Sequence, residues 1–293
     1  MSRCLDFIVD DEYDGKKVVH FLREKAQLSA RLISLLKLVE DGICLNGIRV
    51  RTIDPIKAGD TISIKIPLQG LPQAAFPYPL EILYEDEDIL LVNKPPSLPT
   101  HPSRKHQGKT LANAVTWHLE STRGAAGAFR PIGRLDKGTS GAVLCALNPY
   151  VASRLGGRVQ KTYLAIVHGE FKGKGTIDQP IFRPDPKKTV RACGREGERA
   201  LTHWQALACR EGLSLVRLKL ETGRTHQIRV HFSYLGAPLV GDDMYGAPES
   251  DQDYHFLHCE SMNFTHPVSG RKICVQAPMP PAMKKAADYI IGG

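Results

Sequence analysis

The chain contains no apolar run near the roughly 18 residues that a membrane-spanning helix requires, so a membrane protein is not expected. Its N-terminal segment is acidic and lacks the basic-then-apolar order of a signal peptide, which favours a cytoplasmic location. Neither a Gly-x-Gly-x-x-Gly motif nor a P-loop occurs, so the sequence has no signature of dinucleotide or nucleoside triphosphate binding.

Metal-ligand and disulfide patterns are also missing. The seven cysteines are scattered and form no Cys-x-x-Cys pair, which argues against a disulfide framework and against a zinc site. His226 and His231 are five residues apart, and His255 and His258 have no second cluster at ligand spacing. We therefore expect no structural metal.

Positive charge is abundant and unevenly placed. The 293 residues suffice for one large domain or two modest ones, and the net charge is +8. Between Ser121 and Ala200, fifteen Lys and Arg residues stand against six Asp and Glu residues. Such a surface suits a polyanion, most often a nucleic acid. A solubilising surface is the alternative.

The first 67 residues have a pattern of their own. Apolar spacing predicts a short helix near Val18 to Leu22, and a second helix that Ser29 caps and that runs to Val39. A hairpin is predicted around Asn46-Gly47, followed by a strand over residues 62–66. Residues 68–79 are rich in proline and are interpreted as a linker, so the second domain would span residues 80–293.

Basic residues accompany the two short helices. Six of them lie between Lys16 and Lys37 against one acidic residue, Glu24. Two basic helices backed by a hairpin resemble the alpha-L RNA-binding domain of some small-subunit ribosomal proteins and tRNA-modifying enzymes. A solvated helical face is the alternative. The residues expected to contact RNA here are Lys16, Lys17, Arg31 and Lys37.

The second domain alternates strands with loops. Strands are predicted at Leu80–Tyr84, Ile89–Val92, Lys161–His168, Trp204–Cys209 and Leu213–Glu221. The acidic run from Glu85 to Asp88 is interpreted as a solvated turn, and Thr110–His118 as a short helix. A second helix would hold Ile228 and Phe232, with Thr225 as its cap. The basic, glycine-rich segment Gly169–Arg199, called the flap below, is a candidate RNA contact.

One stretch carries the candidate chemistry. In Gly133-Arg134-Leu135-Asp136-Lys137-Gly138-Thr139-Ser140-Gly141 a carboxylate follows an arginine by two positions, and the apolar run Ala142–Leu147 comes next. The run predicts a buried strand, so Asp136 should lie on a rigid loop beside the core. The alternative is that Asp136 and Thr139 merely cap a turn.

Six separated motifs resemble the RluA-type family of RNA pseudouridine synthases, from about Glu81 to Pro280. They are EDEDILLVNKPPSLPTHP, GRLDKGTSG, KTYLAIVHG, ETGRTHQIRVH, GAPLVGDDMYG and LHCESMNFTHPVSG. The resemblance implies an α+β fold. Its catalytic domain would be built on a mixed, largely antiparallel β-sheet flanked by helices and loops, beside a small N-terminal α/β RNA-binding domain.

The resemblance also assigns roles to residues. Asp136 matches the essential aspartate, Tyr163 the tyrosine against the target base, and Arg224 the arginine that pairs with the carboxylate. Arg134 matches a residue that approaches the RNA where the target nucleotide leaves its stack. Gly133 stands where the family usually has histidine, which bears on the choice of substrate. Further phosphate contacts are expected from Lys94, Lys137, Lys161 and Arg229.

The implied reaction fits these residues. Converting uridine to pseudouridine breaks the bond from base to ribose and rejoins the ribose to carbon 5 of the uracil, without net oxidation or hydrolysis, so no cofactor is expected. An ionised Asp136 can act as a nucleophile at carbon 6 of the base or carbon 1 of the ribose, or as a base at ribose carbon 2. The sequence leaves this choice open. Tyr163 can stack on the base and relay a proton, or simply pack.

Other functions fit parts of the pattern. A silent RNA-binding or ribosome-assembly protein would not need an intact Asp136, Tyr163 and Arg224. A glycosidase-like hydrolase would need Asp242 and Asp243 as partners and would leave the basic flap unexplained. We expect a monomeric enzyme that acts on large-subunit rRNA, with tRNA as the alternative substrate.

Overall fold

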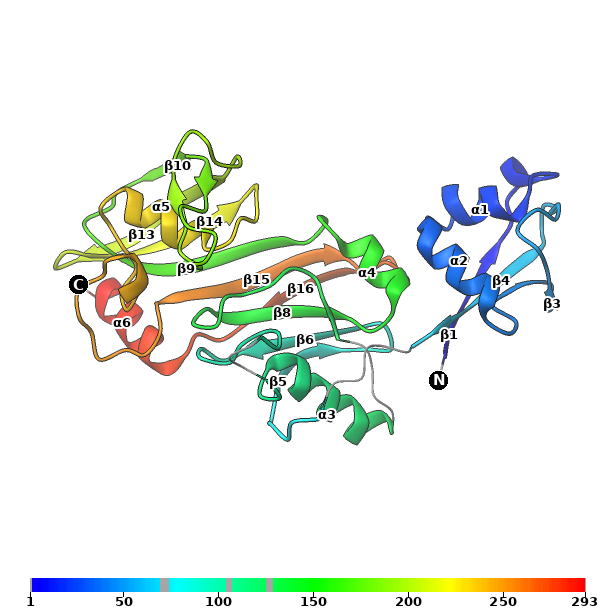
Figure 1. Ribbon diagram of the computed structural model, residues 1–293, viewed down its shortest axis with the longest axis horizontal. Coiled ribbons are helices and arrows are strands. Elements are labelled where there is room, and N and C mark those ends of the chain that lie inside the picture. Colours follow the sequence, from blue (N-terminus) through cyan, green and yellow to red (C-terminus); the bar gives the residue numbers. More distant parts are fainter. Residues whose placement is uncertain (1, 69–73, 104–106, 125–128, 293) are drawn as a thin grey trace.

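The protein is built on a small sheet within residues 2–67 and a large sheet within residues 81–276. The computed structural model describes residues 2–68, 74–103, 107–124 and 129–292, and residues 69–73 of the predicted linker lie outside that part. Figure 1 shows the small N-terminal unit at one end and the large sheet extending away from it. The predicted α+β class is confirmed.

The N-terminal unit is a four-stranded antiparallel sheet in the order β1-β4-β2-β3. Its helices bury Phe21 and Leu36 in the same core as Ile62 and Ile64, which alternate along β4. The elements are β1 (Ser2–Ile8), the 3-10 turn η1 (Asp11–Tyr13), α1 (Val18–Glu24), α2 (Ala30–Leu38), β2 (Ile43–Leu45), β3 (Ile48–Arg49) and β4 (Thr61–Pro67).

Local signals in this unit act as predicted. The Ser29 hydroxyl accepts a hydrogen bond from the Leu32 amide at 3.2 Å and so caps α2. Asn46 and Gly47 both have positive φ angles, 49° and 82°, which a two-residue turn between β2 and β3 requires. The predicted hairpin and second helix are therefore confirmed.

The large sheet has ten strands in the order β10-β13-β14-β9-β15-β8-β6-β5, with β16 beside β15 and β7 beside β8. Its pairs among the described strands are antiparallel except for β8 with β15. The strands are β5 (Glu81–Glu85), β6 (Ile89–Lys94), β7 (Arg130–Pro131), β8 (Ser140–Ala146), β9 (Gln160–His168), β10 (Lys174–Asp178), β13 (Leu201–Arg210), β14 (Leu213–Leu220), β15 (Leu257–Thr265) and β16 (Lys272–Gln276). A separate pair within the flap joins β11 (Ile181–Phe182) to β12 (Ala192–Cys193).

Helices flank this sheet on several sides (Figure 1). They are α3 (Leu111–Arg123), α4 (Pro149–Leu155), α5 (Gln227–Tyr234), the 3-10 turn η2 (Asp243–Tyr245) and α6 (Pro281–Ile291). α3 begins after Thr110 and is longer than predicted, ending at Gly124 with a φ of 66°. No helix in the described ranges is long and apolar enough to cross a membrane.

The parallel contact between β8 and β15 brings the Asp136 loop to the centre of the sheet. β8 is buried throughout and starts four residues after Asp136. Gly141 pairs with Cys259, has a φ of 108°, and a Cβ there would lie 2.4 Å from the Cys259 carbonyl oxygen. Only glycine allows the two backbones to approach this closely.

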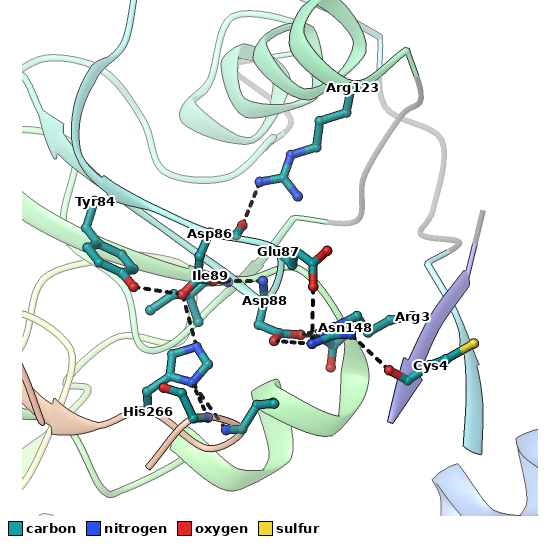
Figure 2. Close-up of polar contacts among 12 residues, drawn as sticks. Arg3, Cys4, Tyr84, Asp86, Glu87, Asp88, Ile89, Arg123, Asn148 and His266 are labelled. Carbon is teal, nitrogen blue, oxygen red and sulfur yellow. Dashed lines mark hydrogen bonds and ion pairs between the residues drawn. The ribbon is translucent and has the colours of Figure 1, made fainter. Parts of the chain in front are cut away.

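The acidic run Glu85–Asp88 is not the solvated turn that the sequence predicted. The Asp88 carboxylate is 5% exposed and accepts bonds from Arg3 Nε at 3.0 Å and from Asn148 Nδ2 at 2.8 Å (Figure 2). Arg3 belongs to β1, so this ion pair ties the N-terminal unit to the large sheet. The rings of Phe7 and Tyr150 also meet across this contact, with centroids 6.3 Å apart.

We predict that Arg3→Gln weakens this contact, because it removes the cation from a buried carboxylate. The free energy of unfolding in urea should fall by on the order of 2 kcal/mol, less than for a fully buried pair since Arg3 is partly exposed. Arg51→Gln is the matched control, because Arg51 pairs with Asp54 on the surface of the same unit. Equal losses from the two substitutions would contradict the interpretation.

Candidate active site

A cleft of about 820 Å³ opens between the Asp136 loop, β9, the end of β14 and the start of α5. The structure brings together here six of the residues that the sequence selected. They are Arg134, Asp136, Lys161, Tyr163, Arg224 and Arg229.

The Asp136 loop is held at three points. The Leu135 carbonyl accepts the Thr100 hydroxyl at 2.8 Å, the Lys137 carbonyl accepts Lys94 Nζ at 3.1 Å, and the Thr139 hydroxyl lies 2.8 Å from His255 Nε2. The turn itself uses the backbone oxygen of Asp136, which accepts the Thr139 amide at 3.1 Å. The carboxylate is therefore not consumed by the turn, and it is 22% exposed to the cleft.

The arginine beside Asp136 is Arg229, not Arg224. Arg229 Nη1 lies 3.7 Å from Asp136 Oδ2, and its Nε and Nη2 donate to both oxygens of the fully buried Asp242 at 2.7 and 2.6 Å. Arg224 instead pairs with Glu198 and donates to the Arg199 carbonyl at the mouth of the cleft. The expected ion pair of Arg224 with Asp136 and the expected phosphate contact of Arg229 are both wrong.

The position at which α5 starts explains why Arg229, and not Arg224, lies beside Asp136. The helix begins at Gln227, after His226 with a φ of 58°, and Thr225 does not cap it as predicted. Arg224 therefore precedes the helix and points outward, whereas Arg229 lies in its first turn among buried residues. The Gln227 side chain stabilises this start by accepting the Arg224 amide at 3.0 Å.

Tyr163 lines the cleft from β9, between Leu218 of β14 and Cys259 of β15. It is 7% exposed. Burial, with the neighbouring Cys259 and the Asp136 carboxylate adding to it, raises the pKa of Tyr163 well above its ordinary value. The hydroxyl thus keeps its proton at neutral pH.

Lys94 does not contact RNA as the sequence predicted, because its side chain is fully buried beneath the Asp136 loop. Its ammonium group donates to the carbonyls of Pro95, Leu98 and Lys137 at 2.9 to 3.1 Å. Burial lowers its pKa to about 7, and the attraction of Asp136 opposes this shift. Lys94 therefore stabilises the backbone of the Asp136 loop and is not a surface charge.

The remaining basic residues are accessible in different degrees. Arg134 is exposed and donates to the Thr225 hydroxyl at 2.5 Å, and Lys137 is exposed beside it. Lys161 is half-buried and donates to the Ile132 carbonyl at 3.0 Å, and burial lowers its pKa. In the N-terminal unit, Lys17, Arg31 and Lys37 are exposed, and Lys16 lies 4.4 Å above the Tyr13 ring.

Three residues at the site were not selected for this chemistry. His226 Nε2 lies 3.9 Å from Asp136 Oδ2, Asp242 holds Arg229, and the Tyr245 ring lies 4.9 Å from the Arg229 guanidinium. Asp242 and Tyr245 belong to the motif GAPLVGDDMYG. Glycine is required at position 241 for this segment to pack against Tyr254. Its φ is 75°, and a Cβ there would lie 2.4 Å from the Tyr254 carbonyl oxygen.

A second polar cluster, Asp86, Asp88 and His266, brings potential metal ligands within 4.8 Å of one another. The carboxylate oxygens of Asp86 and Asp88 already accept hydrogen bonds, however. Asp86 accepts the Tyr84 hydroxyl and two backbone amides, and Asp88 accepts the Arg3 guanidinium (Figure 2). A guanidinium beside the carboxylates favours an ion-pair network over a cation site.

We predict that Lys94 makes stability depend on pH. Between its folded pKa of about 7 and its ordinary 10.5, the unfolded chain binds more protons, so the free energy of unfolding should rise as pH rises. Lys94→Met should reduce this slope by up to about 1.4 kcal/mol per pH unit, measured by urea denaturation from pH 7 to 9. Parallel curves for the two proteins would refute the prediction.

Comparisons with known proteins identify the family of this chain. The family model described as RNA pseudouridylate synthase matches residues 88–234. A Bacillus subtilis protein named as the uncharacterized RNA pseudouridine synthase YjbO is 37% identical over 266 residues, which are 88% of this chain and 94% of that protein. Ribosomal large subunit pseudouridine synthase D of Vibrio cholerae is 35% identical over 84% of this chain and 82% of its own length.

Solved structures agree as well. Human RNA pseudouridylate synthase domain containing 1 superimposes with a TM-score of 0.58 at 29% identity, covering 72% of this chain and 89% of that one. Human RNA pseudouridylate synthase domain containing 4 has the same TM-score at 22% identity, covers 72% of this chain and 93% of that one, and shares the fold. The chain therefore belongs to the family of RNA pseudouridine synthases, of the RluA type.

Proposed function

We propose that this protein isomerises specific uridines of a structured RNA to pseudouridine, with Asp136 as the catalytic carboxylate. One observation carries the proposal: a partly exposed carboxylate lies at the wall of a large cleft, on a loop held at three points, beside a buried arginine. A cation held this close to a carboxylate attracts it and so favours one direction of its oxygens.

The carboxylate acts on a base that has left its helix. Asp136 either adds to carbon 6 of the uracil or carbon 1 of the ribose, or removes the proton from ribose carbon 2. Tyr163 lines the cleft and offers a flat ring for the uracil. Once carbon 5 has joined the ribose, its proton must leave, and that proton provides the assay.

Basic residues around the cleft hold the RNA. Extruding a base costs a few kcal/mol, and the exposed Arg134 offsets part of this by entering the vacated space or binding a phosphate. Lys137 and the half-buried Lys161 are the next candidates for phosphate contacts. Tyr163, Asp136, Arg134 and Lys161 all line the same cleft, so one flipped nucleotide can meet all four.

Large-subunit rRNA is the substrate we favour over tRNA. Several relatives at about 35% identity carry the name ribosomal large subunit pseudouridine synthase D. In residues 1–67, which we assign as an alpha-L type RNA-binding domain, Lys16, Lys17, Arg31 and Lys37 would contact RNA outside the modified site. We further propose that the enzyme works as a monomer, because the chemistry needs only one copy of each residue, and that it works in the cytoplasm.

Asp136→Asn tests the function directly. Incubation with RNA tritiated at carbon 5 of uridine should release tritium for the wild-type protein and none above background for the variant. Asp243→Asn is the matched control, since Asp243 is exposed and adjoins the site without reaching Arg229 or Asp136, and it should keep the wild-type rate within about twofold. Equal release by wild type and Asp136→Asn, or none by either on any RNA tried, would reject the proposal.

Substitutions of Arg229 and of Arg224 should have very different effects on turnover. Arg229→Gln should lower turnover by about 100-fold or more because it removes the cation beside Asp136, whereas Arg224→Gln should stay within about threefold. Arg229→Gln also leaves the Asp242 carboxylate buried without a partner, so Arg229→Gln combined with Asp242→Asn restores a neutral pair. The double variant should fold and remain inactive. Its recovery to wild-type turnover would show that the cation has no catalytic part.

A further inference from the structure

Tyr245 contacts two of the groups that surround Asp136. It ends η2, is 8% exposed, and places its ring 4.9 Å from the Arg229 guanidinium. The same ring meets the His226 ring edge-on, with centroids 5.7 Å apart. Arg229 and His226 are the two side chains that lie within 4 Å of the Asp136 carboxylate among the described ion pairs. Tyr245 therefore contacts both of the side chains that lie next to the Asp136 carboxylate.

The Tyr245 hydroxyl reaches the flap as well. It accepts the Arg191 amide at 3.0 Å, at the base of the flap next to β12. Val190 and Cys193 of the flap pack against the small apolar cluster that contains Tyr245, Ile181 and Val230. One side chain thus touches the flap, the histidine and the arginine.

The Tyr245 hydroxyl has a second partner, the His226 ring. This contact determines which ring nitrogen of His226 carries the proton. A phenolic oxygen that accepts an amide still has one proton to donate, and a buried proton needs an acceptor. His226 Nδ1, at 2.8 Å, is that acceptor. A neutral imidazole that accepts at Nδ1 carries its proton on Nε2, so an N–H group, not a lone pair, lies 3.9 Å from Asp136 Oδ2.

We propose that Tyr245 is a positioning residue for the pseudouridine synthase reaction, which ties the base of the flap to His226 and Arg229 and thereby aims the Asp136 carboxylate. The inference rests on the proposed function. The flap is a candidate RNA contact, and the Tyr245 hydroxyl accepts a hydrogen bond from its Arg191 amide. The position of the flap and the direction of the Asp136 carboxylate would then depend on the same hydroxyl.

Charged groups around His226 set the direction of its titration. Burial lowers its pKa, Arg229 and Arg191 lower it further, and Asp136 and Asp242 oppose them. The bond that Tyr245 donates to Nδ1 also favours the neutral ring. Tyr245→Phe keeps the ring over Arg229 and removes this bond, so protonation of His226 should become easier.

The first test reads His226 directly, by nitrogen-15 NMR of the imidazole in the full chain, with His226→Gln identifying the signal. The wild-type ring should be the neutral Nε2–H tautomer at pH 7. In Tyr245→Phe its pKa should rise by roughly half a unit or more. An Nδ1–H tautomer, or a pKa that the substitution leaves unchanged, overturns the proposal whatever the activity.

The second test reads turnover by tritium release. Tyr245→Phe should lower kcat about tenfold, the effect of one hydrogen bond, while KM for RNA changes less than about twofold. If Tyr245 acts through His226, adding His226→Gln to Tyr245→Phe should cost no more than His226→Gln alone. Fully additive losses, or an unchanged kcat, overturn the proposal.

A matched control separates positioning from stability. Tyr84→Phe removes the same hydroxyl from a partly buried tyrosine that is bonded to Asp86 (Figure 2). Tyr84 does not line the cleft, so this substitution should leave kcat unchanged. An equal fall in kcat for Tyr84→Phe would show that loss of a hydroxyl bond acts through stability, and would overturn the proposal. Absence of tritium release from the wild-type protein would contradict the proposed function instead, and the NMR result would still decide the role of Tyr245.

Discussion

The arrangement depends on one buried cation shared between two carboxylates. Arg229 satisfies the fully buried Asp242 with two short bonds and presents its remaining nitrogen to Asp136 at 3.7 Å. Asp242 alone in this position would be an uncompensated buried charge, which costs several kcal/mol. Its pairing with Arg229 immobilises the guanidinium, and a guanidinium that cannot move can fix the direction of a second carboxylate. The Asp136 carboxylate thus takes its orientation from a pair whose other carboxylate, Asp242, is fully buried.

The large sheet also fixes the position of the loop that carries Asp136. Asp136 precedes a fully buried strand, β8, whose parallel contact with β15 is possible because Gly141 lets the backbones meet. Lys94 reaches under the loop to the Lys137 carbonyl, and His255 holds Thr139 from the strand side. Burial lowers the pKa of His255 to about 2, so this contact stays neutral across the physiological range. The loop is therefore anchored by groups that RNA cannot reach.

The sequence predicted the fold class and most elements, but it did not predict which arginine lies beside Asp136. Helices, strands and turns follow from local periodicity, as with Ser29 and Asn46-Gly47, whose signals lie within a few residues. The role of Arg229 depends on where α5 starts, and the residue that precedes the helix is His226, in the left-handed conformation, one position after the expected Thr225 cap. Lys94 and Asp88 appeared as surface charges because their partners lie far away along the chain, 43 residues for Lys137 and 85 for Arg3.

We propose that Asp136, aimed by Arg229, meets a base that has left its RNA helix. The most direct measurement is a crystal structure of the protein with an RNA whose target uridine is replaced by 5-fluorouridine. The account predicts a flipped pyrimidine against Tyr163, with a ring or ribose carbon within roughly 3.5 Å of the Asp136 carboxylate and Arg229 still joining Asp136 to Asp242. A pyrimidine bound outside this cleft, or an Asp136 carboxylate turned away from it, would contradict the account.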